Sequence, residues 1–157
     1  PPDFTRDPRS QDLALALIQG TTIPSFWRYI EFEQGKPRWE RIDQLLERAK
    51  AKRLRIKSFA LYWGGIGGCP PWLRDLSYAQ QLTAIERWVE TIVTRYKGEV
   101  HCWETVNEMH NWCFGNPFHW SHAQLLEVTR LVNEQVGALD PGVPRLINHC
   151  CIWPYHT

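Results

Sequence analysis

Helical and strand-like segments alternate along most of this chain. The helical segments carry apolar residues at spacings of three and four, and the strand-like segments are short apolar runs. The predicted helices are 39–52, 78–96 and 121–139, and the predicted strands are 21–27, 55–63, 100–107 and 145–150. Successive strands joined by helical crossovers lie parallel in one sheet. We therefore expect an α/β architecture with four adjacent parallel strands in chain order.

Parallel strands joined by helices occur both in doubly wound sheets and in barrels. Doubly wound sheets that bind nucleotides carry a glycine-rich phosphate loop between a strand and a helix. Residues 64–68 read G-G-I-G-G, which lacks both the G-x-G-x-x-G spacing and a following Lys-Ser/Thr pair. The order of elements fits either architecture, but the sequence carries no nucleotide-binding signature.

Nine tryptophans stand out in a chain of 157 residues, and aromatic residues make up 13% of it. Such a content is typical of a large aromatic core, which composition alone favours. The alternative is a carbohydrate cleft, because the C–H faces of sugar rings stack on indole.

Charge and cysteine content bear on other classes of protein. The formal net charge is +1, so nothing favours nucleic acid, a membrane surface or a strongly acidic partner. No apolar run reaches the ~18 residues of a membrane span. Five cysteines cannot all pair within one chain, and the sequence has no C-x-x-C pair. We expect buried free thiols, and neither a metal ion nor an organic cofactor is implied.

The most informative polar cluster is W-E-T-V-N-E, which lies at the carboxyl end of a predicted strand and ends at Glu108. Glycoside cleavage needs one carboxylic acid to protonate the leaving oxygen and a second carboxylate as nucleophile or base. A carboxyl among Trp103, Trp112 and Trp120 would have a raised pKa, which suits the acid. The alternative is that Glu108 only caps the loop that follows the strand.

Two motifs in this region resemble a known family. R-Y-K-G-E-V at 95–100 and W-E-T-V-N-E at 103–108 are similar to R-Y-K-G-x-(I/V) and W-D-V-V-N-E of glycoside hydrolase family 10, the retaining endo-β-1,4-xylanases. The resemblance extends in the same order over most of 21–150. Its other segments are W-R-Y-I-E-F-E-Q-G at 27–35, Leu61–Trp63, Pro71–Leu73, Asp140-Pro141 and Leu146–Asn148.

The resemblance implies a fold and a set of site residues. It implies a partial (β/α)8 TIM barrel, roughly strands two to five with their helices, and a secreted or periplasmic protein. Glu108 takes the position of the general acid/base, Asn107 contacts the sugar 2-hydroxyl, and Trp63 lines the subsite of the attacked sugar. In the aromatic loop after Glu108, we expect Trp112, Phe114 and Trp120 to partly cover it and at least one to line a sugar-sized cleft. The remaining motif residues, Trp27 and Glu31, are interpreted as mainly structural.

Several positions depart from the family pattern. Phe26 stands where the family has lysine, and Thr22-Ile23 where it has a glutamate–asparagine pair. Phe59 and Gly64 replace two histidines, and His149-Cys150-Cys151 replaces D-Y-N. Apolar groups do not compensate the desolvation of sugar hydroxyls. The binding surface is therefore expected to differ from that of an ordinary xylanase.

The nucleophile of the family lies on the seventh strand, and this sequence ends at Thr157 beyond the fifth-strand motif. A full barrel takes about 250 residues. We therefore expect 1–157 to be a single partial barrel domain, with the nucleophile outside this chain and the other half of the barrel supplied by the same gene product or another chain. Such a piece should expose two sheet edges and an apolar interior, and should be inactive alone.

Three interpretations of function follow. The leading one is part of a retaining β-glycosidase that hydrolyses a β-1,4-linked, xylan-like polysaccharide. The second is a non-catalytic carbohydrate-binding or scaffold module derived from a barrel glycosidase. The third is a different clan of barrel glycosidase, because an Asn-Glu pair at the end of the fourth strand is widely shared. A second carboxylate about 5–5.5 Å from Glu108 would favour the first over the second.

Overall fold

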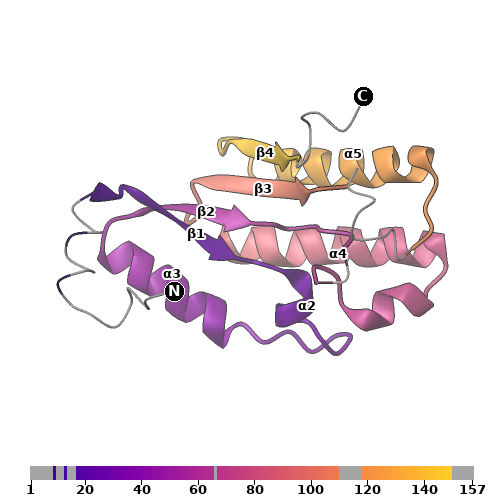
Figure 1. The fold of residues 1–157 in the computed structure, drawn as a ribbon, viewed down its shortest axis with the longest axis horizontal. Coiled ribbons are helices and arrows are strands. Elements are labelled where there is room, and N and C mark those ends of the chain that lie inside the picture. Colours follow the sequence, from indigo (N-terminus) through magenta and orange to yellow (C-terminus); the bar gives the residue numbers. More distant parts are fainter. Residues whose placement is uncertain (1–8, 10–12, 14–16, 66, 110–117, 150–157) are drawn as a thin grey trace, which may run out of the picture.

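The structure is a four-stranded parallel sheet with helices packed against it (Figure 1). This computed structural model describes residues 9, 13, 17–65, 67–109 and 118–149. The strands are β1 (Gly20–Pro24), β2 (Arg55–Phe59), β3 (Cys102–Asn107) and β4 (Arg145–Asn148). They lie in chain order and every neighbouring pair is parallel, which confirms the prediction from the alternating segments.

The three long helices begin and end close to their predicted limits. They are α3 (Glu40–Ala51), α4 (Tyr78–Tyr96) and α5 (His122–Leu139). Ser77 and Ser121 each close a capping box with the glutamine three residues later. Each serine hydroxyl accepts from the glutamine N–H, and the glutamine side chain accepts from the serine N–H. These paired bonds fix where α4 and α5 begin.

The strand predictions extend too far, most of all for the first two strands, and the strand predicted at 55–63 ends at Phe59. The segment predicted as a strand to residue 27 ends at Pro24, and the short helix α2 (Trp27–Ile30) follows. Proline has no N–H to continue a ladder, so it favours a strand end. After β2 the chain still pairs with β3, because Leu61 N donates to Glu104 O and Tyr62 N to Thr105 O, at 2.9 and 3.0 Å.

The segment after this pairing holds a further element. The 3-10 helix η1 (Pro71–Asp75) follows the glycine-rich loop. The sequence has helical periodicity at 11–19 as well, up to Gly20, but this segment falls mostly outside the described residues.

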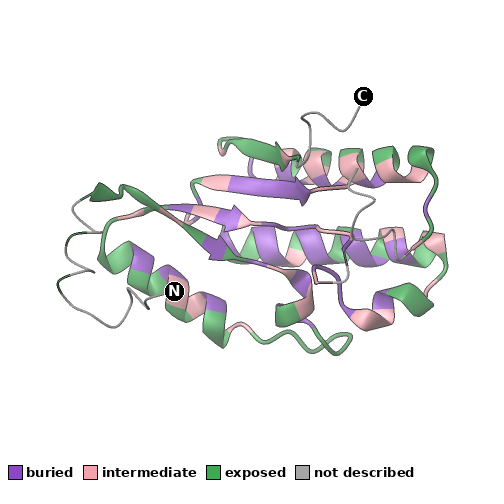
Figure 2. Cartoon of the chain, viewed as in Figure 1, coloured by how far each residue is buried: buried purple, intermediate pink, exposed green. Residues whose placement is uncertain are grey.

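Tryptophans build the core between the sheet and the helices. Trp88 lies between Trp27 and Trp39, with ring centroids 5.4 and 6.1 Å apart and nearly parallel planes. Trp88 Nε1 donates to Leu61 O, and Trp103 Nε1 donates to the buried Asp140 carboxylate. Each indole thus buries its rings and satisfies its N–H. Much of the tryptophan content serves packing, as composition favoured. Buried residues lie on the central strands and on the sides of the helices that face the sheet (Figure 2).

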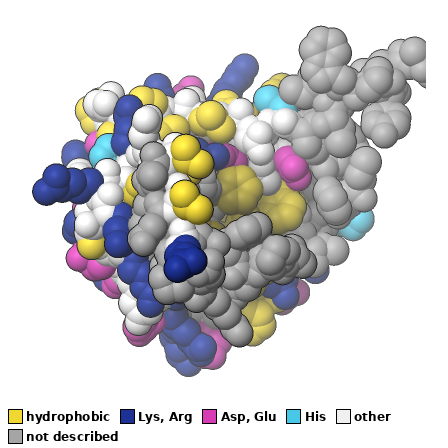
Figure 3. Space-filling model, turned by 60° about the vertical axis from the view of Figure 1, so that its left-hand side comes forward, with side chains coloured by type: hydrophobic (Ala, Val, Ile, Leu, Met, Phe, Trp, Pro, Cys, Tyr) yellow, Lys and Arg dark blue, Asp and Glu magenta, His cyan; other side chains and the backbone are white. Residues whose placement is uncertain are grey.

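The face of the sheet away from the helices is partly charged at β2. The prediction that an open half-barrel exposes an apolar interior is therefore wrong for this strand. Its sequence R-I-K-S-F turns Ile56 and Ser58 into the core, while Arg55 is exposed and Lys57 and Phe59 are half-buried. Lys57 pairs with Glu104 of β3 across this face. Figure 3 shows basic side chains beside hydrophobic ones on the side of the molecule it presents. The strand sequence therefore lowers the apolar area that an open half-barrel exposes.

Candidate active site

The candidate acid, Glu108, directly follows β3, where the carboxyl ends of the parallel strands meet. Its backbone has a φ of 53°, in the left-handed region that side-chain-bearing residues rarely adopt. Glu108 N donates to Asn148 O of β4 at 2.9 Å. A non-glycine residue in this conformation costs about 1–3 kcal/mol and occurs often at functional sites. The sequence carried no signal for this strain.

Asn107 is held more firmly than its neighbour. It is 3% exposed, its N–H donates to Tyr62 O at 2.9 Å, and its Oδ1 accepts from Asn148 Nδ2 at 2.7 Å. Asn148 therefore bonds both residues of the Asn-Glu pair, through its carbonyl to Glu108 and through its amide to Asn107. The end of β4 fixes how the tip of β3 is presented.

A buried ion pair lies on the strand below Glu108. Lys57 Nζ is 2.6 Å from Glu104 Oε2, and the Glu104 side chain is 1% exposed. Glu104 Oε1 is buried and has no hydrogen-bond partner in the described part of the chain. Burial raises the pKa of the Glu104 carboxyl, the hydrogen bond and charge of Lys57 oppose this, and the charge of Glu108 raises the pKa further. The two glutamates are thus close enough to interact electrostatically.

Trp63 lies on the loop that follows β2 and is half-buried against glycines. A Cβ added at Gly65 would lie 2.9 Å from Trp63 Cε2, and one at Gly68 would lie 2.3 Å from Trp63 O. These contacts explain why the loop is glycine-rich, because its backbone approaches the indole more closely than a side chain allows. One at Gly64 would lie 3.7 Å from Met109 Sδ, which places the loop beside the residue after Glu108.

The thiol of Cys69 lies behind this loop. It donates to Trp63 O at 2.9 Å, and burial raises its pKa to about 12, so it is an unreactive core thiol. Cys102 is a second free thiol, half-buried at the start of β3. The other three cysteines lie outside the described residues.

Trp120 does not occupy the position expected of a sugar-binding residue. It is 4% exposed, it stacks on Phe118 and Tyr62 at 4.6 and 6.2 Å, and its Nε1 donates to Gln81 Oε1 at 2.8 Å. An indole enclosed in this way offers no face to a sugar ring. Trp112 and Phe114, the other aromatic residues expected over Glu108, lie outside the described residues.

Glu31 is a structural residue, as the sequence motif suggested for it and for Trp27. Its carboxylate is 1% exposed and accepts from Trp27 Nε1, Gly35 N and Arg87 Nη2 at 2.6 to 2.9 Å. Both oxygens are therefore engaged, and Glu31 is not available as a second catalytic carboxylate.

Two classes of feature do not occur in the described part of the chain. No group of three or more His, Cys, Asp or Glu side chains there could hold a metal ion. None of the described helices combines the length and the apolar character of a membrane span.

Comparison with known proteins identifies relatives of this chain. It is 33% identical over 86 residues to endo-1,4-beta-xylanase 3 of Hypocrea jecorina, a match covering 54% of this chain and 24% of that protein. It is 32% identical over 132 residues to endo-1,4-beta-xylanase C of Phanerodontia chrysosporium, which covers 78% and 31% of the two chains. The chain thus spans less than a third of the length of these relatives.

Solved structures share the fold. The GH10 structure from Paenibacillus barcinonensis matches with a TM-score of 0.70 at 21% identity, covering 93% of this chain and 48% of that one. Xylanase 10B from Thermotoga petrophila RKU-1, solved with xylobiose, matches with a TM-score of 0.73 at 17% identity, covering 94% and 47%. The four strands and their helices thus correspond to part of a TIM barrel.

A family model agrees with the fold and with the motifs around Glu108. The model of Glycosyl hydrolase family 10 matches residues 25–121, a span that runs from just before α2 to the start of α5. The chain therefore belongs to glycosyl hydrolase family 10 and forms part of its (β/α)8 barrel.

Proposed function

We propose that this chain is the part of a retaining β-glycosidase that carries the general acid/base, Glu108, and that the substrate is a β-1,4-linked, xylan-like polysaccharide. The observation that carries the proposal is the presentation of Glu108, which stands at a strand end in a left-handed conformation held by Asn148. A retained strain of this kind is consistent with a functional role. The relatives named endo-1,4-beta-xylanases support the choice of substrate.

The mechanism is a double displacement. Glu108 protonates the glycosidic oxygen as the bond to C1 breaks, while a carboxylate from outside this chain attacks C1. Glu108, now ionised, takes a proton from a water that attacks C1 and releases the sugar. Asn107, whose amide oxygen is engaged by Asn148, donates from Nδ2 to the 2-hydroxyl, and Trp63 lines the subsite of the attacked sugar.

The second carboxylate is proposed to come from the rest of the barrel. Glu31 has both oxygens engaged, and Glu104 lies below the strand tip in an ion pair with Lys57. Residues 1–157 accordingly form a single partial domain that is inactive without the other half of the barrel, from the same gene product or another chain. A polymeric substrate does not enter cells, so the complete enzyme would work outside the cytoplasm.

A non-catalytic carbohydrate-binding role is the second candidate. The observation in its favour is that Phe26 and Phe59, which replace polar residues of the family, contact each other with ring centroids 5.2 Å apart. A site that has lost polar groups can retain binding after losing turnover.

The test is Glu108→Gln in the full-length gene product, assayed on xylan and on an aryl β-xyloside. The substitution keeps the shape and removes the proton donor, so turnover on xylan should fall by about 10²–10⁴-fold. The aryl glycoside should lose less, because its leaving group needs little protonation. Glu108→Ala with added azide should release a glycosyl azide of retained configuration. An unchanged rate on xylan in Glu108→Gln would exclude Glu108 as the acid.

A further inference from the structure

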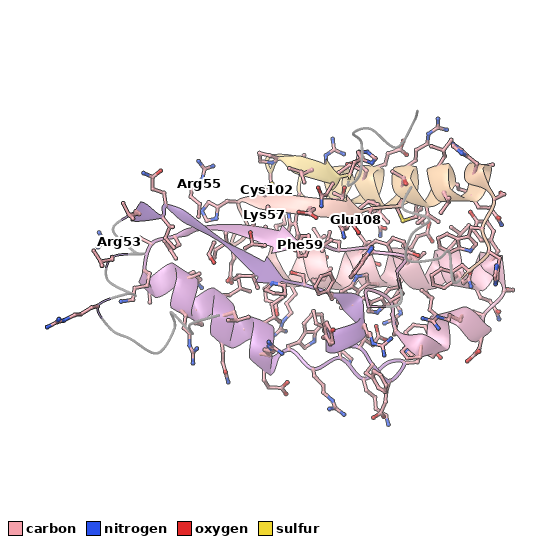
Figure 4. All side chains as sticks on the ribbon, viewed as in Figure 1. Arg53, Arg55, Lys57, Phe59, Cys102 and Glu108 are labelled. Carbon is pink, nitrogen blue, oxygen red and sulfur yellow. The ribbon has the colours of Figure 1, made fainter. Side chains whose placement is uncertain are left out.

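Three half-buried aromatic side chains stand together near the candidate acid. Phe26 precedes α2, Phe59 ends β2 and Trp63 lies on the next loop. The ring centroid of Phe26 is 5.2 Å from that of Phe59 and 5.5 Å from that of Trp63. Phe59 ends β2, and Glu108 directly follows the neighbouring strand β3 (Figure 4). We refer to Phe26, Phe59 and Trp63 as the aromatic wall.

The aromatic wall is fixed by its backbone. Ser25 N donates to Phe59 O, which joins the residue before Phe26 to the end of β2. Arg28 N donates to Gly68 O at 3.0 Å, which joins α2 to the loop that encloses Trp63. The three rings are therefore positioned before any ligand arrives, which reduces the entropy lost on binding.

The chemistry of the aromatic wall is apolar. Lys57 lies beside it, with Nζ 5.3 Å from the Phe59 centroid, but this ammonium is paired with Glu104. The phenol of Tyr29 lies at the outer side, 6.0 Å from Phe26 between centroids, and is largely exposed. A sugar hydroxyl pressed against Phe26 and Phe59 would lose its water without gaining a partner, which is unfavourable.

We propose that the aromatic wall selects sugar units whose hydroxyls are capped by acyl groups, O-acetylated β-glycan in particular, next to the point of cleavage. An ester in place of a hydroxyl has no donor to leave unsatisfied, and its methyl group packs on aromatic rings. This inference deepens the proposed function and rests on it for the glycan backbone. Phe26 and Phe59 thereby determine specificity for acyl-capped sugars, which the polar residues of the family at these two positions would not do.

The test measures binding, so that it does not depend on turnover. The full-length gene product carrying Glu108→Gln is titrated with acetylated xylo-oligosaccharides and with the same oligosaccharides after mild alkaline deacetylation. Calorimetry gives the two dissociation constants for each protein. The acetylated ligand should bind at least about threefold more tightly, since one unsatisfied hydroxyl costs a factor of this order or more.

Variants of the wall assign the preference to it. Phe59→His supplies a hydrogen-bonding group and should shift the ratio of the two constants roughly tenfold toward the deacetylated ligand. Phe26→Lys should shift it in the same direction and gives a second measurement should the first variant not fold, as judged by circular dichroism. Phe59→Leu keeps the surface apolar and should retain the preference.

The outcomes separate this inference from the proposed function. Equal or tighter binding of the deacetylated ligand, or failure of both ligands to bind at millimolar concentration, would overturn the selection of acyl-capped sugars. A ratio unchanged in both Phe59→His and Phe26→Lys would also overturn it. Preference for the acetylated ligand together with an inert wild-type enzyme would refute the proposed catalysis and leave the inference standing.

Discussion

Replacing Glu31 by glutamine tests whether this carboxylate is a structural anchor. In the folded protein Oε1 accepts from Gly35 N and Arg87 Nη2, and Oε2 accepts from Trp27 Nε1 and Arg87 Nη2. Glutamine keeps a single acceptor oxygen. Its NH2 group takes the place of the second carboxylate oxygen and faces the N–H donors that this oxygen bonded. The Gln NH2 should face Gly35, because Gly35 is exposed and Trp27 is 1% exposed.

The loss can be worked from these contacts. The bond to Gly35 N is worth about 1 kcal/mol, because this N–H can turn to water. The charged bonds to Arg87 add about 1–2 kcal/mol, a value reduced because the Arg87 side chain is 43% exposed. We expect Glu31→Gln to lower the free energy of unfolding by about 2–3 kcal/mol, measured by urea denaturation of the full-length gene product.

The matched control lies two residues further along the chain. Glu33 pairs with Lys36 and Arg38 at the surface, with its side chain 50% exposed. Exposed pairs contribute little, so Glu33→Gln should leave stability essentially unchanged. If Glu31→Gln unfolds within about 0.5 kcal/mol of this control, the assignment of Glu31 as a structural anchor is wrong.

Three further predictions concern the site and its supports. Glu108→Gly should raise the free energy of unfolding by about 1 kcal/mol while abolishing activity, because glycine adopts the left-handed backbone without strain; urea denaturation measures the gain, and a loss of stability would contradict it. Glu104→Gln removes a carboxyl whose pKa lies above its ordinary 4.5 in the folded state, so the folded protein is disfavoured as pH rises through that raised pKa. The stability of this variant relative to wild type should therefore increase between about pH 4 and pH 7, and denaturation at both pH values gives the sign. Gly68→Ala places a methyl group 2.3 Å from Trp63 O and should lower the free energy of unfolding by about 1–3 kcal/mol or more. Gly142→Ala meets nothing within 4 Å and should be near neutral.

The fold was predictable where local signals agree. The spacing of apolar residues predicted α4 and α5 nearly to the residue, and in the structure each begins at a serine–glutamine capping box. The end of β1 was missed, because Phe26 and Trp27 were included in a strand interrupted by Pro24, whereas the strand ends at the proline. The inner face of β2 was also predicted wrongly. This strand of five residues carries two cations, and only the assembled sheet shows on which side they lie.

The candidate site was predictable to a smaller extent. The motif that ends at Glu108 pointed to the candidate acid, but its left-handed conformation and its bond to Asn148 depend on a strand about 40 residues later. Amino-acid composition could not distinguish tryptophans of the core from tryptophans of a cleft. Trp120 and Trp63 both flank predicted loops, and only packing shows that Trp120 is enclosed while Trp63 keeps part of its surface exposed.

The double attachment of Asn148 has a consequence for how the site could be transferred or divided. The backbone of Glu108 is bonded across the strand pair β3–β4, which α5 connects. The β–α–β unit from Cys102 to Asn148 carries both bonds of Asn148 within one contiguous stretch of chain, and Tyr62 adds the bond from Asn107 N from outside it. Grafting that unit into another parallel barrel would transfer the oriented carboxyl group of the candidate acid, and the recipient barrel would have to supply the second carboxylate.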